Sequence, residues 1–203
     1  MSALIHTQLL TQVGDLQNLK KIIKLNGVLF LERKKDDELF EHLAKTVVGQ
    51  QLSIAAANTI WKRVLDLYSE TDNTLLNYCL DINSDKLKKC GLSKNKTKAL
   101  VEISIACRES QFPKEVCRAA EIDTIIKRVS SLYGLGKWSA EMTGIFFFAL
   151  ENVWSEDDAA LRRGLMLISE RDSVEPITII DKVSPYKSYL ALHIWKGLDT
   201  GIL

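Results

Sequence analysis

The sequence predicts an all-α protein, and three observations lead to this fold class. Apolar residues recur every three or four positions in several segments, which is the period of an amphipathic helix. No long alternation of apolar and polar residues, the pattern of a strand, stands out. Only 3 prolines and 10 glycines occur among 203 residues, of which 46% are hydrophobic and 26% charged, a composition typical of a globular protein. A chain of this length can form one domain or two small lobes.

The first clear helix begins at about Leu39 and ends near Gly49, with Leu43 and Val47 on its apolar face. Ser53 can accept a hydrogen bond from an N–H group at the start of the next helix, which we expect over residues 54–68. The intervening segment Val-Gly-Gln-Gln-Leu-Ser is then a tight turn between two helices, from which two amide side chains project.

Further helices are expected along the rest of the chain. They cover residues 85–90, 94–107, a segment capped by Asp123, 138–150, a segment from about 159, and 184–198. Gly91 closes the first of them, because glycine adopts the left-handed backbone that ends many helices. Pro113 separates the second from the third.

Residues 129–140, VSSLYGLGKWSA, are predicted to form a helix, a glycine-bounded turn and a second helix. Gly134 and Gly136 permit backbone conformations that other residues resist. The start of the second helix presents N–H groups and a partial positive charge, which suit a DNA phosphate. Such a contact would hold the DNA backbone without reading its sequence. A tight interhelical turn without a ligand is the alternative interpretation.

An acidic loop and another helix follow about twenty residues after this turn, in the segment VWSEDDAALRR of residues 153–163. Acidic residues at a helix N-terminus are common as caps and as partners of the helix dipole. For Asp157 and Asp158 taken alone, capping is the simpler interpretation.

Together these motifs resemble the helix-hairpin-helix DNA glycosylase superfamily, and within it the sequence is most similar to the 3-methyladenine DNA glycosylase II branch. The resemblance covers about residues 35–200. It rests on four segments in order: 49–57 (GQQLSIAAA), 91–100 (GLSKNKTKAL), the hairpin with its continuation 138–142 (WSAEM), and 185–191 (PYKSYLA) with Trp195.

The resemblance implies a two-lobed fold with the active-site cleft between the lobes. Residues 36–140 would form a central lobe ending in the helix-hairpin-helix. Residues 1–35 and 141–203 would form a second lobe that carries the catalytic aspartate.

The implied activity is base-excision repair of damaged double-stranded DNA, by hydrolysis of the N-glycosidic bond of alkylated purines such as 3-methyladenine. Cleaving this bond builds positive charge on the sugar, which a nearby carboxylate stabilises. The family pattern assigns that carboxylate to Asp158, which would also orient or deprotonate water. Whether Asp157 contributes stays open. The target base must be flipped out of the duplex, which leaves a gap to be filled.

The resemblance also assigns residues that contact the base and the DNA. Trp138 and Tyr186 would line the base pocket, because aromatic faces suit a cationic base. Trp61, Trp154 and Trp195 are expected to be packing residues. The DNA-binding and wedge residues would be Gln50, Gln51, Leu52, Gly134, Gly136, Lys137 and Ser139.

No strand cleavage is expected, because bifunctional members of the family carry a nucleophilic lysine at the position of Trp138. Lys137 precedes this position. If the match to the family shifted by one residue, Lys137 would occupy the position of the nucleophile, and strand cleavage would again be possible. No cofactor is required, although the hairpin carbonyls of Ser130, Leu132 and Leu135 are implied ligands of a structural Na⁺ or K⁺. An iron–sulfur cluster is not expected, since the four cysteines form no Cys-x-x-Cys pair.

Two other functions remain open: a glycosylase for oxidised or deaminated bases, and a non-catalytic helix-hairpin-helix DNA-binding module. A pure DNA-binding module needs neither Asp158 nor a wedge. The net charge of +1 does not by itself indicate a nucleic-acid partner, although six lysines lie within residues 86–98. We expect a monomer inside the cell, in the cytoplasm or nucleoid of a bacterium or the nucleus of a eukaryote, with no membrane-spanning stretch.

Overall fold

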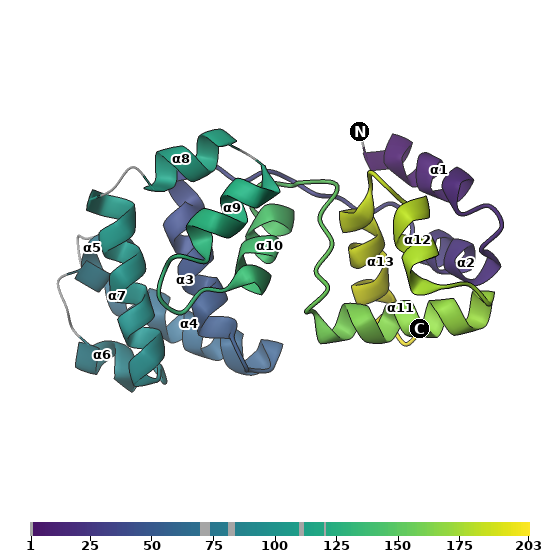
Figure 1. Ribbon diagram of the computed structural model, residues 1–203. Coiled ribbons are helices and arrows are strands. Elements are labelled where there is room, and N and C mark those ends of the chain that lie inside the picture. Colours follow the sequence, from purple (N-terminus) through teal and green to yellow (C-terminus); the bar gives the residue numbers. More distant parts are fainter. Residues whose placement is uncertain (1, 70–73, 81–83, 110–111, 120) are drawn as a thin grey trace. The chain divides into compact units, whose positions relative to one another are not determined.

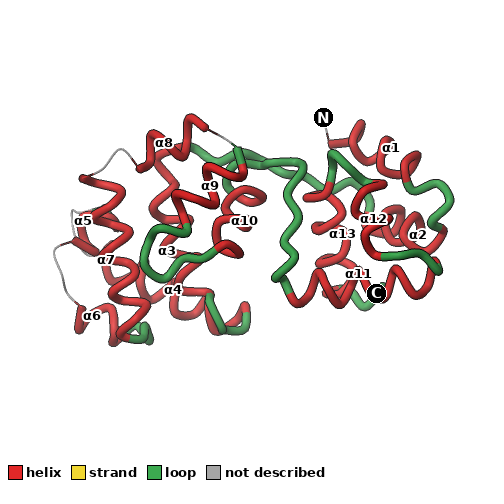
Figure 2. The backbone as a smooth tube through the Cα atoms, viewed as in Figure 1, coloured by secondary structure: helices red, strands yellow, loops and turns green. Residues whose placement is uncertain are grey.

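The computed structural model describes residues 2–69, 74–80, 84–109, 112–119 and 121–203, and every regular element in this part of the chain is a helix (Figure 1 and Figure 2). The all-α prediction is therefore confirmed. The chain divides into two compact units: unit 1 comprises Met1–Arg33 and Gly144–Leu203, and unit 2 comprises Lys34–Thr143. The lobes expected from the sequence divide after residues 35 and 140, and the observed units divide after residues 33 and 143.

Unit 1 contains α1 (Ser2–Gln12), α2 (Gln17–Asn26), α11 (Ala159–Asp172), α12 (Pro176–Lys182) and α13 (Lys187–Asp199). Helix α11 packs against both α13 and α2, so segments from the two ends of the chain share one core (Figure 1). Gly164 permits the close approach of α11 to α13, because a Cβ there would collide with Cγ2 of Ile194. Asp172 at the end of α11 accepts hydrogen bonds from the N–H groups of Asn18 (2.8 Å) and Leu19 (3.0 Å) and so caps the start of α2.

Unit 2 contains the short 3₁₀ helix η1 (Asp36–Glu38), α3 (Leu39–Gly49), α4 (Ile54–Ser69), α5 (Leu75–Leu80), α6 (Ser84–Lys89), α7 (Lys94–Glu109), α8 (Phe112–Ala119), α9 (Ile122–Val129) and the first part of α10 (Lys137–Phe146). Helix α3 packs against α4 and α7, and α7 also contacts α5, α6 and α8. The apolar faces of α3 and α7 are fully buried at Leu43, Val47, Leu100 and Ile103.

Two of the predicted helix-end signals are confirmed. The hydroxyl of Ser53 accepts the N–H of Ala56 at 3.3 Å, as expected of a residue that caps α4. Gly91 has a φ of 103° and donates its N–H to the carbonyl of Lys88, which closes α6. The cap predicted at Asp123 is wrong, because α9 begins after Glu121 and Asp123 lies inside its first turn.

Two predicted helix boundaries are also wrong. Helix α10 ends at Phe146 rather than Leu150, because Ala149 adopts a left-handed φ of 55° and the N–H of Leu150 returns to the carbonyl of Gly144. Helix α13 begins at Lys187 rather than Ser184, because the helical backbone conformation is disfavoured for Ser184, the residue before Pro185, and Tyr186 takes the cap position.

None of the helices in the described part of the chain has the length and apolar composition that crossing a lipid bilayer requires.

Candidate active site and DNA-binding turns

Asp158 is the N-cap residue of α11, directly before its first residue Ala159. Its backbone is extended (φ −73°, ψ 115°), and Oδ1 accepts the N–H of Leu161 at 2.8 Å. The side chain is half-buried, whereas that of Asp157 is exposed. The capping interpretation therefore holds for Asp158, and the N–H of Leu161 fixes the orientation of this carboxylate.

The loop before α11 is anchored by Ser188, a fully buried residue in the first turn of α13. The Ser188 hydroxyl donates to the carbonyl of Leu150 (2.6 Å) and accepts the N–H of Val153 (2.9 Å). The N–H of Ser188 donates to the carbonyl of Glu151 (3.0 Å). These contacts tie the segment that leads into Asp158 to the core of unit 1.

Trp195 contacts Asp158 directly. Its indole N–H donates to Oδ1 at 3.3 Å, so this oxygen accepts two hydrogen bonds. The indole also lies against the ring of Phe146, with centroids 5.5 Å apart and planes tilted by 32°. Trp195 packs against the core of unit 1 as expected, whereas its contacts with Asp158 and with the ring of Phe146 were not predicted.

A cavity of about 370 Å³ adjoins this aromatic pair. Its lining residues are Leu29, Phe30, Phe146, Leu192, Trp195, Lys196 and Asp199. The walls are largely apolar, and the two rings offer π-faces to a planar or cationic group. Asp158 is not one of the lining residues; its connection to this cavity is the hydrogen bond from the indole N–H of Trp195.

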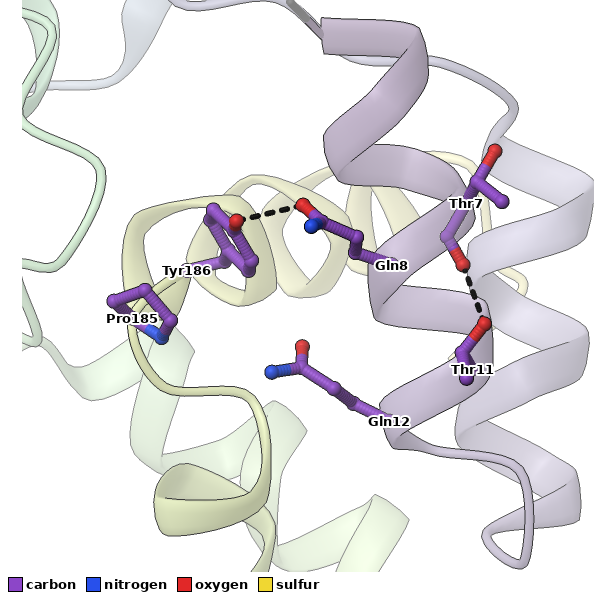
Figure 3. Close-up of a pocket in the computed structure, with 6 residues that line it drawn as sticks. All are labelled: Thr7, Gln8, Thr11, Gln12, Pro185 and Tyr186. Atoms are coloured by element: carbon purple, nitrogen blue, oxygen red, sulfur yellow. Dashed lines mark hydrogen bonds between the residues drawn. The ribbon is translucent and has the colours of Figure 1, made fainter.

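Tyr186 lines a different cavity of unit 1. Its hydroxyl donates to Oε1 of Gln8 on α1 at 2.6 Å (Figure 3). This cavity of about 400 Å³ is lined by Thr7, Gln8, Thr11, Gln12, Pro185 and Tyr186, and shares none of these residues with the cavity beside Trp195. The structure therefore brings Trp195, and not the Tyr186 hydroxyl, to the carboxylate of Asp158.

The predicted hairpin of unit 2 links α9 to α10. Gly134 has a φ of 83°, and a Cβ there would lie 2.7 Å from Cβ of Ala99, so the turn packs closely on α7. A Cβ on Gly136 would meet no atom within 4 Å. The N–H of Ala140 returns to the carbonyl of Gly136. The residues before Ala140 therefore form the first turn of α10. A helix can bind an anion through the backbone N–H groups of its first turn.

The side chains at the start of α10 differ in exposure. Lys137 is exposed and forms an ion pair with the buried carboxylate of Glu141 at 3.6 Å. Trp138 is 37% exposed. Ser139 is buried, with its hydroxyl 3.5 Å from the amide nitrogen of Gln50. A DNA contact by Ser139 would therefore have to come from its backbone.

The three predicted wedge residues, in the turn between α3 and α4, differ in their exposure and contacts. Gln51 is exposed with a φ of 58°, and Leu52 is 39% exposed. The Gln50 side chain instead lies against the hairpin, where its amide donates to the carbonyl of Gly134 at 2.8 Å. Of the three predicted wedge residues, Gln51 and Leu52 are therefore the exposed ones.

The predicted cation ligands lie within the hairpin turn. The N–H of Leu135 donates to the carbonyl of Leu132 at 3.1 Å, and the buried hydroxyl of Ser130 has no hydrogen-bond partner in the described part of the chain. This hydroxyl is not one of the carbonyl ligands that the resemblance implies, and of those carbonyls the one of Leu132 already accepts a backbone N–H. Among the described residues, no three His, Cys, Asp or Glu side chains are grouped as a metal site would require.

Two of the known proteins to which this chain is similar are named DNA-3-methyladenine glycosylases. DNA-3-methyladenine glycosylase 1 of Schizosaccharomyces pombe is 26% identical over 186 residues, which cover 89% of this chain and 82% of the relative. DNA-3-methyladenine glycosylase 2 of Escherichia coli is 25% identical over 169 residues, which cover 78% of this chain and 57% of the relative.

Two solved structures share the fold. The DNA-3-methyladenine glycosidase of Bacillus halodurans superposes with a TM-score of 0.75 and 26% identity, over 92% of this chain and 87% of the other. The S. pombe 3-methyladenine DNA glycosylase in complex with abasic DNA superposes with a TM-score of 0.73 and 24% identity, over 90% of this chain and 91% of the other.

The family comparison identifies the fold family directly. Residues 44–165 match the HhH-GPD superfamily of base excision DNA repair proteins. The matched segment is more than half of the chain, and contains the exposed turn at Gln51, the hairpin and Asp158. With these motifs in the order that the sequence predicted, the chain belongs to the HhH-GPD superfamily of base excision DNA repair proteins.

Proposed function

We propose that this protein is a monofunctional DNA glycosylase that hydrolyses the N-glycosidic bond of alkylated purines, such as 3-methyladenine, in damaged double-stranded DNA. The observation that carries the proposal is the carboxylate of Asp158, which is oriented by hydrogen bonds from Leu161 and from Trp195, and Trp195 in turn lines an apolar cavity. The names of the relatives, which are 3-methyladenine glycosylases, support the same substrate class.

The reaction places positive charge on the deoxyribose as the bond to the base breaks. Asp158 stabilises this charge electrostatically and orients or deprotonates the attacking water. The hydrogen bonds from Leu161 and Trp195 hold its Oδ1, so the carboxylate need not reorganise during the reaction. A base alkylated on a ring nitrogen is already cationic and leaves without a strong general acid.

Aromatic rings recognise the cationic base in this proposal. Trp195 is supported by its hydrogen bond to Asp158, and Phe146 by its ring contact with Trp195. Trp138 is supported by its exposure at the start of α10. Tyr186 is a weaker candidate, since its hydroxyl is engaged with Gln8. Stacking and cation–π attraction would favour an electron-poor ring over an ordinary purine.

The exposed turns of unit 2 hold and open the duplex. The first turn of α10 binds a DNA phosphate through its backbone N–H groups. Gln51 and Leu52 occupy the gap that the flipped nucleotide leaves. A Na⁺ or K⁺ held by the carbonyls of Ser130, Leu132 and Leu135 would add positive charge beside that phosphate. We further propose that the protein acts as a monomer, inside the cell, on nucleoid or nuclear DNA.

The absence of strand cleavage follows from the residues at the start of α10. Trp138 has no amine, and Lys137 is paired with the buried Glu141 carboxylate. Schiff-base formation requires an amine that reaches the sugar, and the contact with Glu141 directs the Lys137 amine along its own helix.

The test is release of free bases from methylated duplex DNA, separated by chromatography, with strand breaks scored before and after hot alkali. Release of methylated purines, with breaks that appear only after alkali, is the expected result. Breaks without alkali would contradict the monofunctional mechanism. Release of oxidised or deaminated bases alone would overturn the alkylpurine assignment, and DNA binding without release of any base would indicate a non-catalytic module.

A further inference from the structure

Lys96 makes two contacts that differ from those of the lysines around it. It lies in the first turn of α7, and its ammonium donates to the carbonyls of Val48 (2.9 Å) and Gln50 (2.8 Å). Its side chain is half-buried, whereas Lys94 and Lys98 on either side are exposed. Burial lowers the pKa of Lys96 from its ordinary value. Lys96 therefore differs from the exposed lysines beside it, because its ammonium is engaged with the end of α3 and the turn that follows.

The contacts benefit α3 and the turn that follows, and not the helix that carries Lys96. A cation near the N-terminus of α7 is unfavourable to that helix, because the helix dipole is positive there. Val48 and Gln50 lie at the C-terminal end of α3, where carbonyl groups lack helical partners and a lysine stabilises them. The ammonium thus caps α3 from a neighbouring helix.

Gln50 extends this connection to the hairpin. Its carbonyl accepts from Lys96, and its side-chain amide donates to the carbonyl of Gly134. The next residue, Gln51, has a left-handed φ of 58°, a conformation that a non-glycine residue keeps only when its surroundings hold it. Two hydrogen-bonded contacts therefore join α7, the exposed turn and the hairpin within unit 2.

We propose that Lys96 is a positioning residue for base flipping: with Gln50 as the link, it holds the exposed Gln51–Leu52 turn at a fixed place relative to the phosphate-binding hairpin. This inference rests on the proposed glycosylase function. When the hairpin binds a phosphate, a turn held in this way enters the duplex at a defined nucleotide. A loose turn leaves binding intact but fails to stabilise the flipped state.

The experiment compares Lys96→Met with Lys94→Met. Both variants remove one positive charge from the first turn of α7, but Lys94 is exposed and Lys96 contacts the turn. Each is assayed for release of the same alkylated purine from two duplexes, one with a normal base opposite the lesion and one with an abasic site opposite it. Unpairing the damaged base costs less free energy in the second duplex. Base release from that duplex therefore depends less on the Gln51–Leu52 turn.

For Lys96→Met we expect single-turnover release from the normally paired duplex to fall by about 10- to 100-fold, the range that a small misplacement can cause. Release opposite the abasic site should fall much less. Lys94→Met should reduce both rates equally and slightly, and Lys96→Arg, which keeps a donor, should restore part of the difference.

Equal losses on both duplexes, or a Lys96→Met pattern identical to that of Lys94→Met, would overturn the positioning role. If Lys96→Met does not fold, Gln50→Leu decides the question: loss confined to the paired duplex supports the proposal, and uniform loss refutes it. Failure of the glycosylase proposal is a separate result, because the native chain would then release no base from either duplex.

Discussion

The two units present their candidate functional groups in different chemical forms. In unit 1 the group is a side chain, the carboxylate of Asp158, which is oriented by a backbone N–H and by the indole of Trp195. In unit 2 the groups are mainly backbone: the first turn of α10 after Gly134, and the exposed turn at Gln51. The contribution of unit 1 to activity should therefore depend on the identity of single side chains. The contribution of unit 2 should depend more on backbone geometry.

The largest expected effect tests the side chain of unit 1. Asp158→Asn should lower base release by at least about 100-fold, because the negative charge that stabilises the sugar is removed. Folding should persist, since asparagine caps helices as well as aspartate does. Single-turnover release and thermal unfolding measure the two quantities.

Asp157→Asn is the matched control for this substitution. The Asp157 side chain is exposed and adjacent, so its loss should change the release rate little. Comparable losses of base release in the two variants would show that the two aspartates do not differ in function. An unchanged release rate in Asp158→Asn would contradict the catalytic assignment.

The next prediction compares two crowded glycines, one in each unit. Gly164→Ala forces a Cβ against Ile194, and Gly134→Ala forces one against Ala99 at a position with φ 83°. Each should reduce the free energy of unfolding by about 1–3 kcal/mol through overpacking, with added backbone strain at Gly134. Denaturant unfolding provides the measurement.

DNA affinity distinguishes the two glycine variants. Gly134→Ala should also weaken binding to undamaged duplex, because it distorts the hairpin, whereas Gly164→Ala should not. Gly136→Ala, whose Cβ has no neighbour within 4 Å, should destabilise the fold less than Gly134→Ala. Equal stability of Gly134→Ala and Gly136→Ala would show that the hairpin accommodates the crowding.

A smaller effect is expected at the tryptophans. Trp195→Phe keeps a ring against Phe146 but removes the indole N–H from Asp158, so release of alkylated purines should fall by about tenfold, as for one hydrogen bond to a charged group. Trp138→Phe keeps a ring at the start of α10 and should reduce release less. If only Trp138→Phe impairs release, the base is recognised from unit 2.

The last prediction concerns stability in acid rather than base release, and involves one histidine of each unit, the half-buried His42 of unit 2 and the buried His193 of unit 1. Burial, with Lys34 and Lys45 nearby, lowers the pKa of His42 to about 4, and burial, with His6 and Lys196 nearby, lowers the pKa of His193 to about 3. Both histidines bind protons more weakly when folded than when unfolded. Stability is therefore fully present above the ordinary pKa of about 6.5 and is lost as the pH falls below it, by up to about 1.4 kcal/mol per pH unit for each histidine.

Denaturant unfolding between pH 7.5 and pH 5 measures this loss. His193→Gln and His42→Gln should each reduce the slope of stability against pH. A slope that neither variant changes would show that other groups govern acid unfolding.

Several features of the fold were predicted correctly because they depend on neighbouring residues. The cap at Ser53, the stop at Gly91 and the start of α11 after Asp158 each follow from contacts within four residues. Helices α1, α2, α5, α8 and α12 were not predicted, since several are short and depend on packing within their unit. The cap of α2 illustrates this dependence, because Asp172 supplies it from 154 positions away.

Local pattern was also insufficient for the details of the site. The contact of Trp195 with Asp158 spans 37 positions, so nothing in the sequence separated Trp195 from the tryptophans expected to pack. Gln50 was grouped with Gln51 because both are amides in one turn. Only the structure shows that Gln50 bends onto the hairpin, 84 positions away.

The sequence by itself determined the helical fold class, the glycine-bounded hairpin and the aspartate at the start of a helix, because helix period, capping and positive φ depend on short-range sterics and hydrogen bonds. The tertiary structure decided which side chains meet: Trp195 with Asp158, Gln50 with Gly134, and Lys96 with the end of α3. Such contacts depend on how helices pack, and packing sums many weak interactions between residues distant in sequence.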